Sequence, residues 1–455
     1  MTALTTSGAH PAAGRANADT RPLAAVIGAD LQVPLVTGEH TRYVNLDYAA
    51  SAPALQSVAE RVATVLPLYS SVHRGAGYAS AVSTGAYEAA RAGIGSFVGA
   101  RDDDVVIVTR NTTDALNLLA TAVPGPVVHL DIEHHANLLP WQARGGRAVT
   151  ARATLADTLE VVEAQLGREP AALLTVTGAS NVTGECLPLQ ELAAIAHRHG
   201  ARIAVDGAQL TPHRRVDIAA LGVDYLAFSG HKLYAPFGAG VLVGRRDWLD
   251  AAPPYLAGGG AVRRVRLEGT TWADSPARHE AGTPNVIGAV ALAAACRAVA
   301  ALPDRAATTH ESTLLARLSD GLGVIDGVHE LRLWPEAERI GVVTFTVDGY
   351  PAELVAQYLS AEHGIGVRDG RFCAHPLLHR LNPAGSAVRA SVGLGSRSED
   401  VDRLLDALGS LRRDGTRWSY AGVDGEYLPQ ADPRPLPDWL VPAQVAASPC
   451  AGVRG

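Results

Sequence analysis

Short apolar runs alternate with helical patterns along most of the chain. Five such runs, at residues 105–109, 127–131, 172–177, 202–206 and 223–229, have the length and the β-branched content of buried strands. Stretches with apolar residues at helical spacing follow several of them. Strands that alternate with helices predict a parallel sheet covered by helices, and such a sheet binds its ligand at the carboxyl ends of its strands.

The chain of 455 residues is longer than one hydrophobic core usually supports, so we expect two domains. Residues 1–35 are rich in Ala, Thr and Gly and are interpreted as a disordered leader that lacks a secretory signal. Residues 36–305 are expected to form a large domain. Residues 306–413 are expected to form a small α/β domain to which an N-terminal segment contributes. The Pro-, Asp- and Gly-rich residues 414–455 are expected to be an irregular tail.

Composition narrows the range of functions. The formal charge of −7 is mild and no basic stripe is present, which argues against nucleic-acid binding. Every apolar stretch is shorter than the roughly 18 residues that suggest a transmembrane helix, so we expect a cytoplasmic protein without a membrane partner. The cysteines Cys186, Cys296, Cys373 and Cys450 are far apart and show no disulfide or metal-site spacing.

Chemically useful side chains follow the predicted strands. Asn181, Asp206, Gln209 and Lys232 all stand just beyond strand ends, where the ligand site of a parallel sheet lies. Lys232, in the turn Ser229-Gly-His-Lys, suits a Schiff base with pyridoxal phosphate, although a surface lysine is the alternative. An aspartate in the position of Asp206 suits pairing with a protonated pyridine nitrogen, the alternative being a solvated loop carboxylate.

Four further segments carry weaker signals. Asn111, Thr112 and Thr113 stand at a predicted helix start, which predicts either ordinary capping or a phosphate site. The adjacent His134 and His135 could suggest a metal site, but neighbours on an extended chain point in opposite directions and rarely bind one ion together. One imidazole stacked on a planar ring is the preferred interpretation.

A polar loop contains His73, which by itself is more typical of a structural loop residue. Cys373 lies in another polar loop, where Arg368 and Arg371 favour a reactive thiolate over an inert core thiol.

Taken together, these segments resemble the fold-type I pyridoxal-phosphate enzymes of aminotransferase class V. Within that class they resemble the cysteine desulfurase and selenocysteine lyase group. The resemblance runs from about Tyr43 to Leu411 and rests on motifs in the order of the family: SVHRG, NTTDALN, EHHANLLPW, SNVTG, VDGAQ, FSGHKLYAPFGAG, EAGTPN, VRDGRFCAHPLLHRL and VRAS. It implies a large domain with a mostly parallel seven-stranded sheet and a smaller C-terminal α/β domain.

The resemblance also implies roles for individual residues. Lys232 would be the Schiff-base lysine and proton carrier, and His134 would stack on the ring and take part in catalysis. The other residues implied to bind the cofactor are Thr112, Thr113, Asp206, Gln209, Ser229, His231 and, from the neighbouring subunit of a homodimer, Thr283.

The implied substrate is an amino acid. Asn181 and Arg389 would hold its carboxylate, and His73 and Arg368 are placed with them in the substrate-binding set. Cys373 would take the sulfur of L-cysteine as a persulfide, release L-alanine, and pass the sulfur to an acceptor protein. No metal is expected.

Departures from the family pattern leave the substrate open. Asp369 stands where threonine is usual, Phe237 where small or hydroxylated residues are usual, and Arg371-Phe372 where two histidines are frequent. The alternatives are a C–S or selenocysteine lyase in a specialised pathway, a class V aminotransferase, and a sulfur-carrier scaffold without turnover. The retained lysine, aspartate and arginine argue against the scaffold, and Cys373 argues against transamination.

Overall fold

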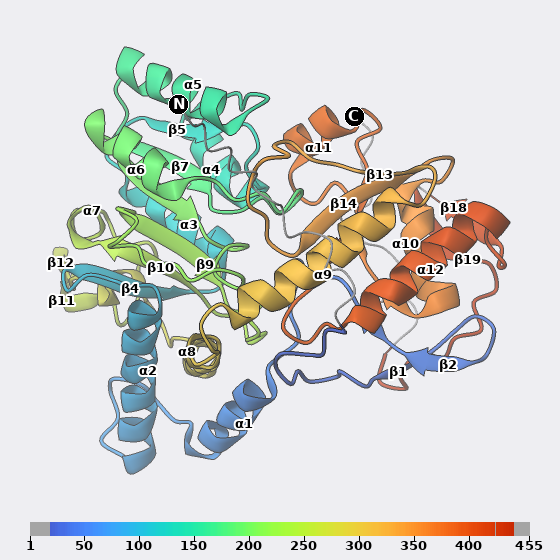
Figure 1. Cartoon of the computed structure of the whole chain (residues 1–455). Coiled ribbons are helices and arrows are strands. Elements are labelled where there is room, and N and C mark those ends of the chain that lie inside the picture. The colour runs from blue at the N-terminus through green and yellow to red at the C-terminus, as the bar shows by residue number, and fades with distance from the viewer. Residues whose placement is uncertain (1–18, 424, 441–455) are drawn as a thin grey trace, which may run out of the picture.

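The computed structural model of the chain describes residues 19–423 and 425–440. It contains two separate sheets of four or more strands, each packed against helices, with the long helix α9 (Ala306–Gly323) beginning where the chain passes from one to the other (Figure 1). The fold is the α/β arrangement that the sequence predicts.

The larger sheet has seven strands in the order β4-β10-β9-β8-β7-β5-β6. All neighbours in the run β9-β8-β7-β5-β6 are parallel, and β10 is antiparallel to both β9 and β4. The strands are β4 (Asp104–Thr109), β5 (Val127–Leu130), β6 (Arg147–Val149), β7 (Leu173–Thr177), β8 (Arg202–Asp206), β9 (Tyr225–Ser229) and β10 (Gly240–Arg245). The prediction of a mostly parallel seven-stranded sheet is confirmed.

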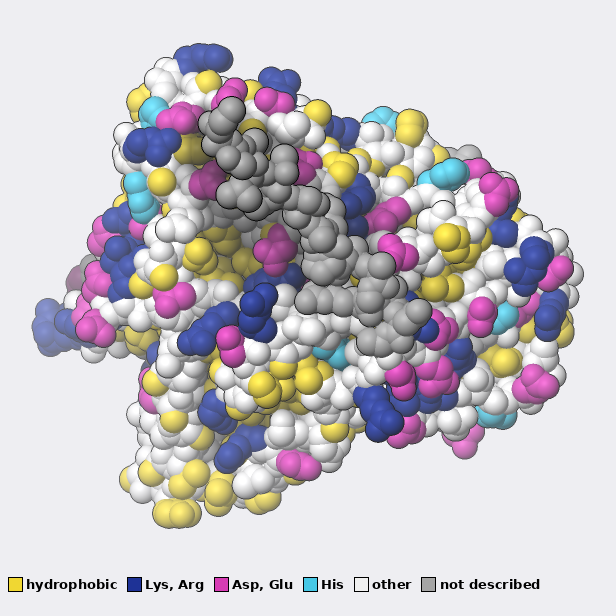
Figure 2. Space-filling model, viewed as in Figure 1, with side chains coloured by type: hydrophobic (Ala, Val, Ile, Leu, Met, Phe, Trp, Pro, Cys, Tyr) yellow, Lys and Arg dark blue, Asp and Glu magenta, His cyan; other side chains and the backbone are white. Residues whose placement is uncertain are grey.

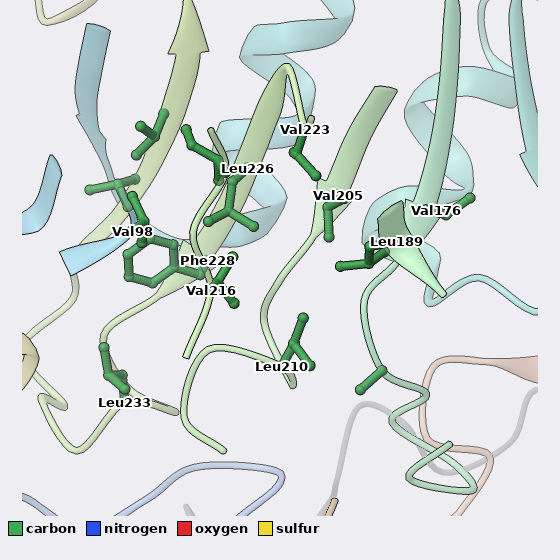
Figure 3. Close-up of a cluster of buried hydrophobic side chains, with 14 of the residues drawn as sticks. Val98, Val176, Leu189, Val205, Leu210, Val216, Val223, Leu226, Phe228 and Leu233 are labelled. Carbon is green, nitrogen blue, oxygen red and sulfur yellow. The ribbon is translucent and has the colours of Figure 1, made fainter. Parts of the chain in front are cut away.

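Both faces of this sheet are buried, which explains why its strands are continuously apolar. Successive side chains of a strand point to opposite faces, so in β9 Leu226 and Phe228 join one core while Tyr225 and Ala227 join another. Figure 3 shows the first of these cores, in which Val205 packs with Leu226 and Phe228.

Helices cover each face of the large sheet. The core that contains Leu226 includes side chains from α1 (Gln56–Val65), α2 (Tyr78–Phe97), α5 (Leu155–Arg168), α6 (Leu189–Arg198) and α8 (Val286–Ala300). The opposite core includes side chains from α3 (Thr112–Ala122), α4 (Leu139–Gln142) and α7 (Arg246–Ala251). The hairpin of β11 (Val262–Arg266) and β12 (Gly269–Trp272) extends the chain between α7 and α8.

The second sheet is antiparallel, with the order β13-β14-β17-β16. Its strands are β13 (Val328–Glu330), β14 (Val342–Val347), β16 (Arg368–Gly370) and β17 (Ala387–Ser391). One face packs on α9, α10 (Ala352–His363) and α12 (Ser398–Asp414), and α11 (His375–Leu381) follows β16.

The large sheet with its helices is called the first body, and the second sheet with its helices is called the second body. The N-terminal segment packs with the second body. Strand β3 (Val44–Asn45) pairs in parallel with β15 (Ile365–Gly366), and Val44 and Leu46 belong to the same core as α9 and α12. A two-stranded sheet of β1 (Gln32–Pro34) and β2 (His40–Arg42) precedes it. The division into domains at residues 36–305 and 306–413 stays a prediction.

Two segments differ from the sequence-based expectation. Residues 1–18 of the predicted leader lie outside the described residues, but residues 19–35 contain β1 and bond to the body, with the Leu23 and Ala24 amides donating to Leu394. The tail from residue 414 was expected to be irregular, yet it forms a hairpin of β18 (Tyr420–Val423) and β19 (Glu426–Pro429). Buried Glu362 holds this segment by accepting hydrogen bonds from Arg417, Trp418 and Tyr420.

Acidic and basic side chains are interspersed over the face of the molecule shown in Figure 2. Among the helices of residues 19–423 and 425–440, none combines the length and the apolar character needed to cross a bilayer.

Candidate active site

A cavity of about 310 Å³ lies at the carboxyl ends of β5, β7, β8 and β9 and is closed on one side by the second sheet. Twelve of the fourteen predicted site residues line it: Thr112, Thr113, His134, Asn181, Asp206, Gln209, Ser229, His231, Lys232, Arg368, Cys373 and Arg389. Side chains that are spread over some 280 positions of the sequence therefore meet in one cavity.

Lys232 enters the cavity from the turn between β9 and β10. Burial lowers the pKa of its amine to about 8, even though the Asp206 carboxylate opposes that shift. A lysine with this pKa is partly neutral near pH 7.5, so its amine has a lone pair available for a carbonyl group. The adjacent His231 is also held neutral, since burial and then Lys232 lower its pKa to about 4.

Asp206 and Gln209 form the floor of the cavity at the end of β8. The Asp206 carboxylate is buried and accepts a hydrogen bond from the Ala208 amide at 3.0 Å, and burial raises its pKa. The Gln209 side chain donates to the carbonyl of Ala49 at 2.7 Å, while its buried Oε1 has no hydrogen-bond partner among the described residues. A buried acceptor without a partner is costly unless a ligand supplies a donor.

His134 is oriented by the backbone. Its Nδ1 accepts a hydrogen bond from the Ala136 amide at 3.0 Å, and burial followed by the charge of Lys232 lowers its pKa to about 3. The ring is therefore neutral and its plane is set. In the described part of the chain no group of three or more His, Cys, Asp or Glu residues is placed to hold a metal ion.

The N-terminus of α3 faces the cavity. Asn111 caps the helix by accepting from the Asp114 amide, and the Thr112 amide donates to Ser229 Oγ at 2.8 Å, with the two hydroxyl oxygens 2.6 Å apart. Free helix amides and clustered hydroxyls bind phosphate well. Asn111 lines the cavity too, although it was not among the residues predicted to bind the cofactor.

Arg389, on β17, brings a buried positive charge to the opposite wall. It donates to the carbonyl of Asn181 at 2.9 Å and to Asp47 Oδ1 at 3.2 Å, while its Nε is buried without a partner among the described residues. Its exposed fraction is only 3%. A carboxylate that enters the cavity can therefore bind a buried guanidinium that still has an unused N–H donor. Arg368 stands opposite it on the neighbouring strand β16.

Cys373 lies where β16 leads into α11. The Asn181 side chain donates to the carbonyl of Phe372 at 2.7 Å, and the His135 amide donates to the carbonyl of Cys373 at 2.8 Å. The Arg389 guanidinium lies 5.2 Å from the centre of the Phe372 ring. Of the departures from the family pattern, Phe372 lines the cavity, whereas Asp369 and Phe237 do not. Burial and then Glu353 raise the pKa of Asp369 to about 6.

His73 and Thr283 are the two predicted site residues that do not line the cavity. His73 is exposed, its backbone amide donates to Thr84 Oγ1, and its ring bonds to Glu88 at 2.8 Å. Thr283 is also exposed. Both assignments stay predictions.

Asp47 is the most important residue that sequence reasoning missed. It is the ion-pair partner of Arg389 at 3.2 Å, and burial raises its pKa while Arg389 opposes that shift. Its pairing joins residues 342 positions apart, so no local pattern reveals it. Ala49 and Ala50, in the same YVNLDYAASA segment, also line the cavity.

The residues present fit a planar, phosphorylated pyridine aldehyde. Lys232 offers a partly neutral amine, Asp206 a carboxylate, and the start of α3 an anion site, while the unpartnered Gln209 Oε1 matches a ring hydroxyl. Fold and site together define the class of fold-type I pyridoxal-phosphate proteins.

Comparison with known proteins places the chain within that class. It belongs to the aminotransferase class-V family, whose model matches residues 44–404. It is 40% identical over 392 residues to a cysteine desulfurase of Dickeya dadantii strain 3937, covering 83% of this chain and 93% of that protein.

Two solved structures agree. The apo structure of a cysteine desulfurase from Thermococcus onnurineus NA1 matches with a TM-score of 0.75 and 32% identity, covering 82% of this chain and 95% of that one. An Escherichia coli cysteine desulfurase in an S-sulfonic acid form matches with a TM-score of 0.71 and 33% identity, covering 80% of this chain and 94% of that one.

Proposed function

We propose that this protein uses pyridoxal phosphate to convert L-cysteine to L-alanine and retains the sulfur on Cys373 as a persulfide, the reaction of a cysteine desulfurase. The observation that carries the proposal is the presence of Cys373 and Lys232 on the walls of one cavity, with Arg389 beside them. A lysine and an arginine alone would also suit an aminotransferase. Desulfuration additionally requires a thiol nucleophile, which Cys373 provides.

The substrate carboxylate would bind Arg389 and the Asn181 side chain. Arg389 is fixed by the Asn181 carbonyl and by Asp47, which leaves its Nε for an incoming anion. A planar guanidinium binds a carboxylate through two parallel hydrogen bonds, which a lysine cannot reproduce. This contact would fix the α-carbon of the substrate with respect to Lys232.

Lys232 would act as the base that removes the α-proton and later as the acid that returns protons. Its pKa of about 8 suits both directions of transfer near neutral pH. When bound, the cofactor supplies an electron-accepting ring, and Asp206 would pair with its nitrogen while the neutral His134 ring lies against its face. The Thr112, Thr113 and Ser229 groups at the start of α3 would hold the phosphate.

Cys373 would take the sulfur. Its Sγ attacks the sulfur of the substrate, an S–S bond forms, and the C–S bond of the substrate breaks with its electron pair left on the β-carbon. That carbon is protonated, so cysteine plus the Cys373 thiol yields alanine plus the Cys373 persulfide. Atoms and electrons balance without an external oxidant. Transfer of the terminal sulfur to an acceptor protein or a reductant would restore the thiol.

Several finer assignments belong to the same proposal. We expect a homodimer, in which Thr283 of one subunit reaches the phosphate held by the other, and a protein that accepts the sulfur. A cytoplasmic location also stays a prediction.

The deciding experiment is the amount of alanine released from L-cysteine by the purified protein, with and without dithiothreitol. Alanine should accumulate in an amount close to that of the enzyme without the reductant, and over many turnovers with it. The Cys373→Ala variant should keep the visible cofactor spectrum and lose at least about 100-fold in alanine formation, as expected when a nucleophile is removed.

The matched control is Cys186→Ala, because Cys186 is a partly buried thiol outside the cavity whose pKa burial raises to about 12. It should retain normal turnover. Release of pyruvate and sulfide would indicate a C–S lyase instead, and an amino-group exchange with a keto acid would indicate an aminotransferase. Full activity of Cys373→Ala would contradict the proposed role of the thiol.

A further inference from the structure

The backbone that presents Cys373 adopts an unfavourable conformation. Phe372 and Cys373 both have positive φ angles, of 51° and 52°, in the left-handed region that residues with a side chain seldom occupy. Two such residues in succession persist only when surrounding contacts hold them. The position of the nucleophile therefore depends on whatever fastens this short segment.

Two backbone hydrogen bonds fasten the segment to the large sheet. The Asn181 side chain binds the carbonyl of Phe372 at 2.7 Å from the loop that follows β7. The His135 amide binds the carbonyl of Cys373 at 2.8 Å from the loop that follows β5. Both bonds cross from one body to the other, since Phe372 and Cys373 follow β16 of the second sheet.

A side-chain contact continues the second of these bonds. The rings of His135 and His375 meet edge to face, with centroids 4.4 Å apart and planes inclined by 71°. His375 is the first residue of α11 and stands only two positions beyond Cys373. His135 therefore holds the segment at two points, through its amide at Cys373 and through its ring just beyond it.

The chemistry proposed above uses neither of these rings. His134 has the place beside the cofactor, and Nδ1 of that ring is occupied by the Ala136 amide. His375 is largely exposed, so its ring gains little from burial alone, and its closest ring partner is His135. The contact between the two rings contributes little to the core and lies beside the strained Cys373 backbone. Its role is therefore interpreted as positioning of Cys373.

We propose that His135 and His375 are positioning residues that form a clasp, defined as the contact between their two rings, and that this clasp holds Cys373 in its left-handed conformation. The inference rests on the proposed function, because it assumes that Cys373 is the thiol that takes the sulfur. With the clasp open, the segment relaxes toward ordinary backbone angles and the Sγ atom leaves its place beside the substrate.

Three variants test the clasp. His375→Ala removes the ring, and His375→Phe keeps an aromatic ring able to meet His135 edge to face. His379→Ala is the matched control, since His379 is an exposed histidine one turn further along α11. Because His375 and His379 are exposed, all three proteins should fold, which thermal unfolding would verify.

The first measurement is independent of turnover. The rate at which iodoacetamide alkylates Cys373 is followed by mass spectrometry of the peptide that contains it, with the buried Cys296 as an internal reference. His375→Ala should change this rate by roughly 2- to 10-fold, the factor that corresponds to the loss of an aromatic pair. His375→Phe and His379→Ala should react like the unaltered protein.

The second measurement is cysteine turnover. His375→Ala should lower kcat by a similar factor and leave KM nearly unchanged, because Arg389 is not displaced, and His375→Phe should restore kcat. Unchanged Cys373 alkylation in His375→Ala, or equal effects of the Ala and Phe variants, would overturn the clasp. A changed alkylation rate in a protein that makes no alanine would instead overturn the proposed function and leave the clasp standing.

Discussion

At the scale of single residues, burial rather than direct bonding sets the chemistry of the site. The nearby Asp206 carboxylate by itself would raise the pKa of Lys232. Desolvation of the buried amine has the larger effect and lowers the pKa of Lys232 to about 8. The same effect keeps His134 and His231 neutral. The cavity therefore holds two neutral imidazoles and a partly deprotonated amine next to the cationic Arg389.

This balance predicts how pH governs cofactor binding. Pyridoxal phosphate added to cofactor-free protein should form the yellow lysine-bound species at a rate that rises with pH and levels off above about 8, where the amine of Lys232 has lost its proton. An ordinary lysine, with a pKa of 10.5, would give a rate that still climbs at pH 9. Rapid-mixing absorbance measures the rate.

The control for that measurement is Lys232→Ala. It should show no visible band of lysine-bound cofactor at any pH, because the Schiff base requires the amine. A visible spectrum unchanged by the substitution would remove Lys232 from the site, and a rate that keeps rising beyond pH 9 would show that its pKa is not lowered.

At the scale of elements, the phosphate end of the cavity depends on how closely β10 approaches the start of α3. Gly240 makes that approach possible, because a Cβ at this position would lie 2.5 Å from Cα and 2.6 Å from the carbonyl carbon of Asn111. Ser229 pairs with Gly240 and binds the Thr112 amide, so strand pairing and helix capping are joined here.

Gly240→Ala should therefore weaken both the fold and the binding of the cofactor. The clashing atoms belong to the backbone of Asn111, which cannot move aside as easily as the end of a flexible side chain. We expect a loss of about 1–3 kcal/mol in the free energy of unfolding. We also expect the dissociation constant of pyridoxal phosphate to rise by at least ~10-fold. Thermal unfolding and fluorescence titration measure the two effects.

Gly85→Ala is the matched control, because Gly85 lies within α2 and a Cβ there meets no atom within 4 Å. Alanine favours a helix interior over glycine by about 0.5–1 kcal/mol, so this variant should be slightly more stable and bind cofactor normally. Equal cofactor affinity in Gly240→Ala and Gly85→Ala would contradict the assigned role of the close approach.

At the scale of the whole molecule, the site requires the two sheets to hold a fixed relation, since Lys232 comes from one body and Arg389 and Cys373 from the other. A buried charge cluster joins them. Glu311 of α9 accepts from Arg214 at 2.6 Å and pairs with His213, both in the segment that follows Gln209. Burial alone would raise the pKa of Glu311, but His213 and Arg214 outweigh it and the pKa is lowered.

Glu311→Gln should destabilise the protein by about 3 kcal/mol at neutral pH, because it removes the buried anion that holds the partly buried Arg214 and His213. A carboxyl whose pKa is lowered on folding stabilises the fold above its unfolded pKa, and that stability is lost as the pH falls through its folded pKa. The difference in the free energy of unfolding between Glu311→Gln and the unaltered protein should therefore shrink as the pH falls below about 4.5. Urea unfolding at pH 7 and pH 4 measures it.

Glu338→Gln provides the comparison on the same arginine, since Glu338 binds Arg214 at 2.7 Å but its side chain is 66% exposed. An exposed ion pair contributes about 0–1 kcal/mol, so this variant should be nearly neutral. A loss in Glu338→Gln as large as that in Glu311→Gln would show that burial is not the deciding factor.

Local patterns account for a large part of what was predictable. Continuous apolar strands alternating with helices predicted the parallel sheet, because burial on both faces leaves that signature. The strand-end rule then placed Asp206, Gln209 and Lys232 in one cavity, since the carboxyl ends of parallel strands meet at one edge. The tail hairpin escaped prediction because it is held by Glu362, more than fifty positions away.

The sequence by itself determined the class of fold, the lysine-centred chemistry and most side chains of the cavity, because each depends on short-range periodicity or on a strand and the turn that follows it. Only the tertiary structure decided the partners of those side chains. The Asp47–Arg389 pair, the His135–His375 contact and the buried cluster around Glu311 each join distant segments. Such contacts have no local signature, since they exist only after the two bodies have packed together.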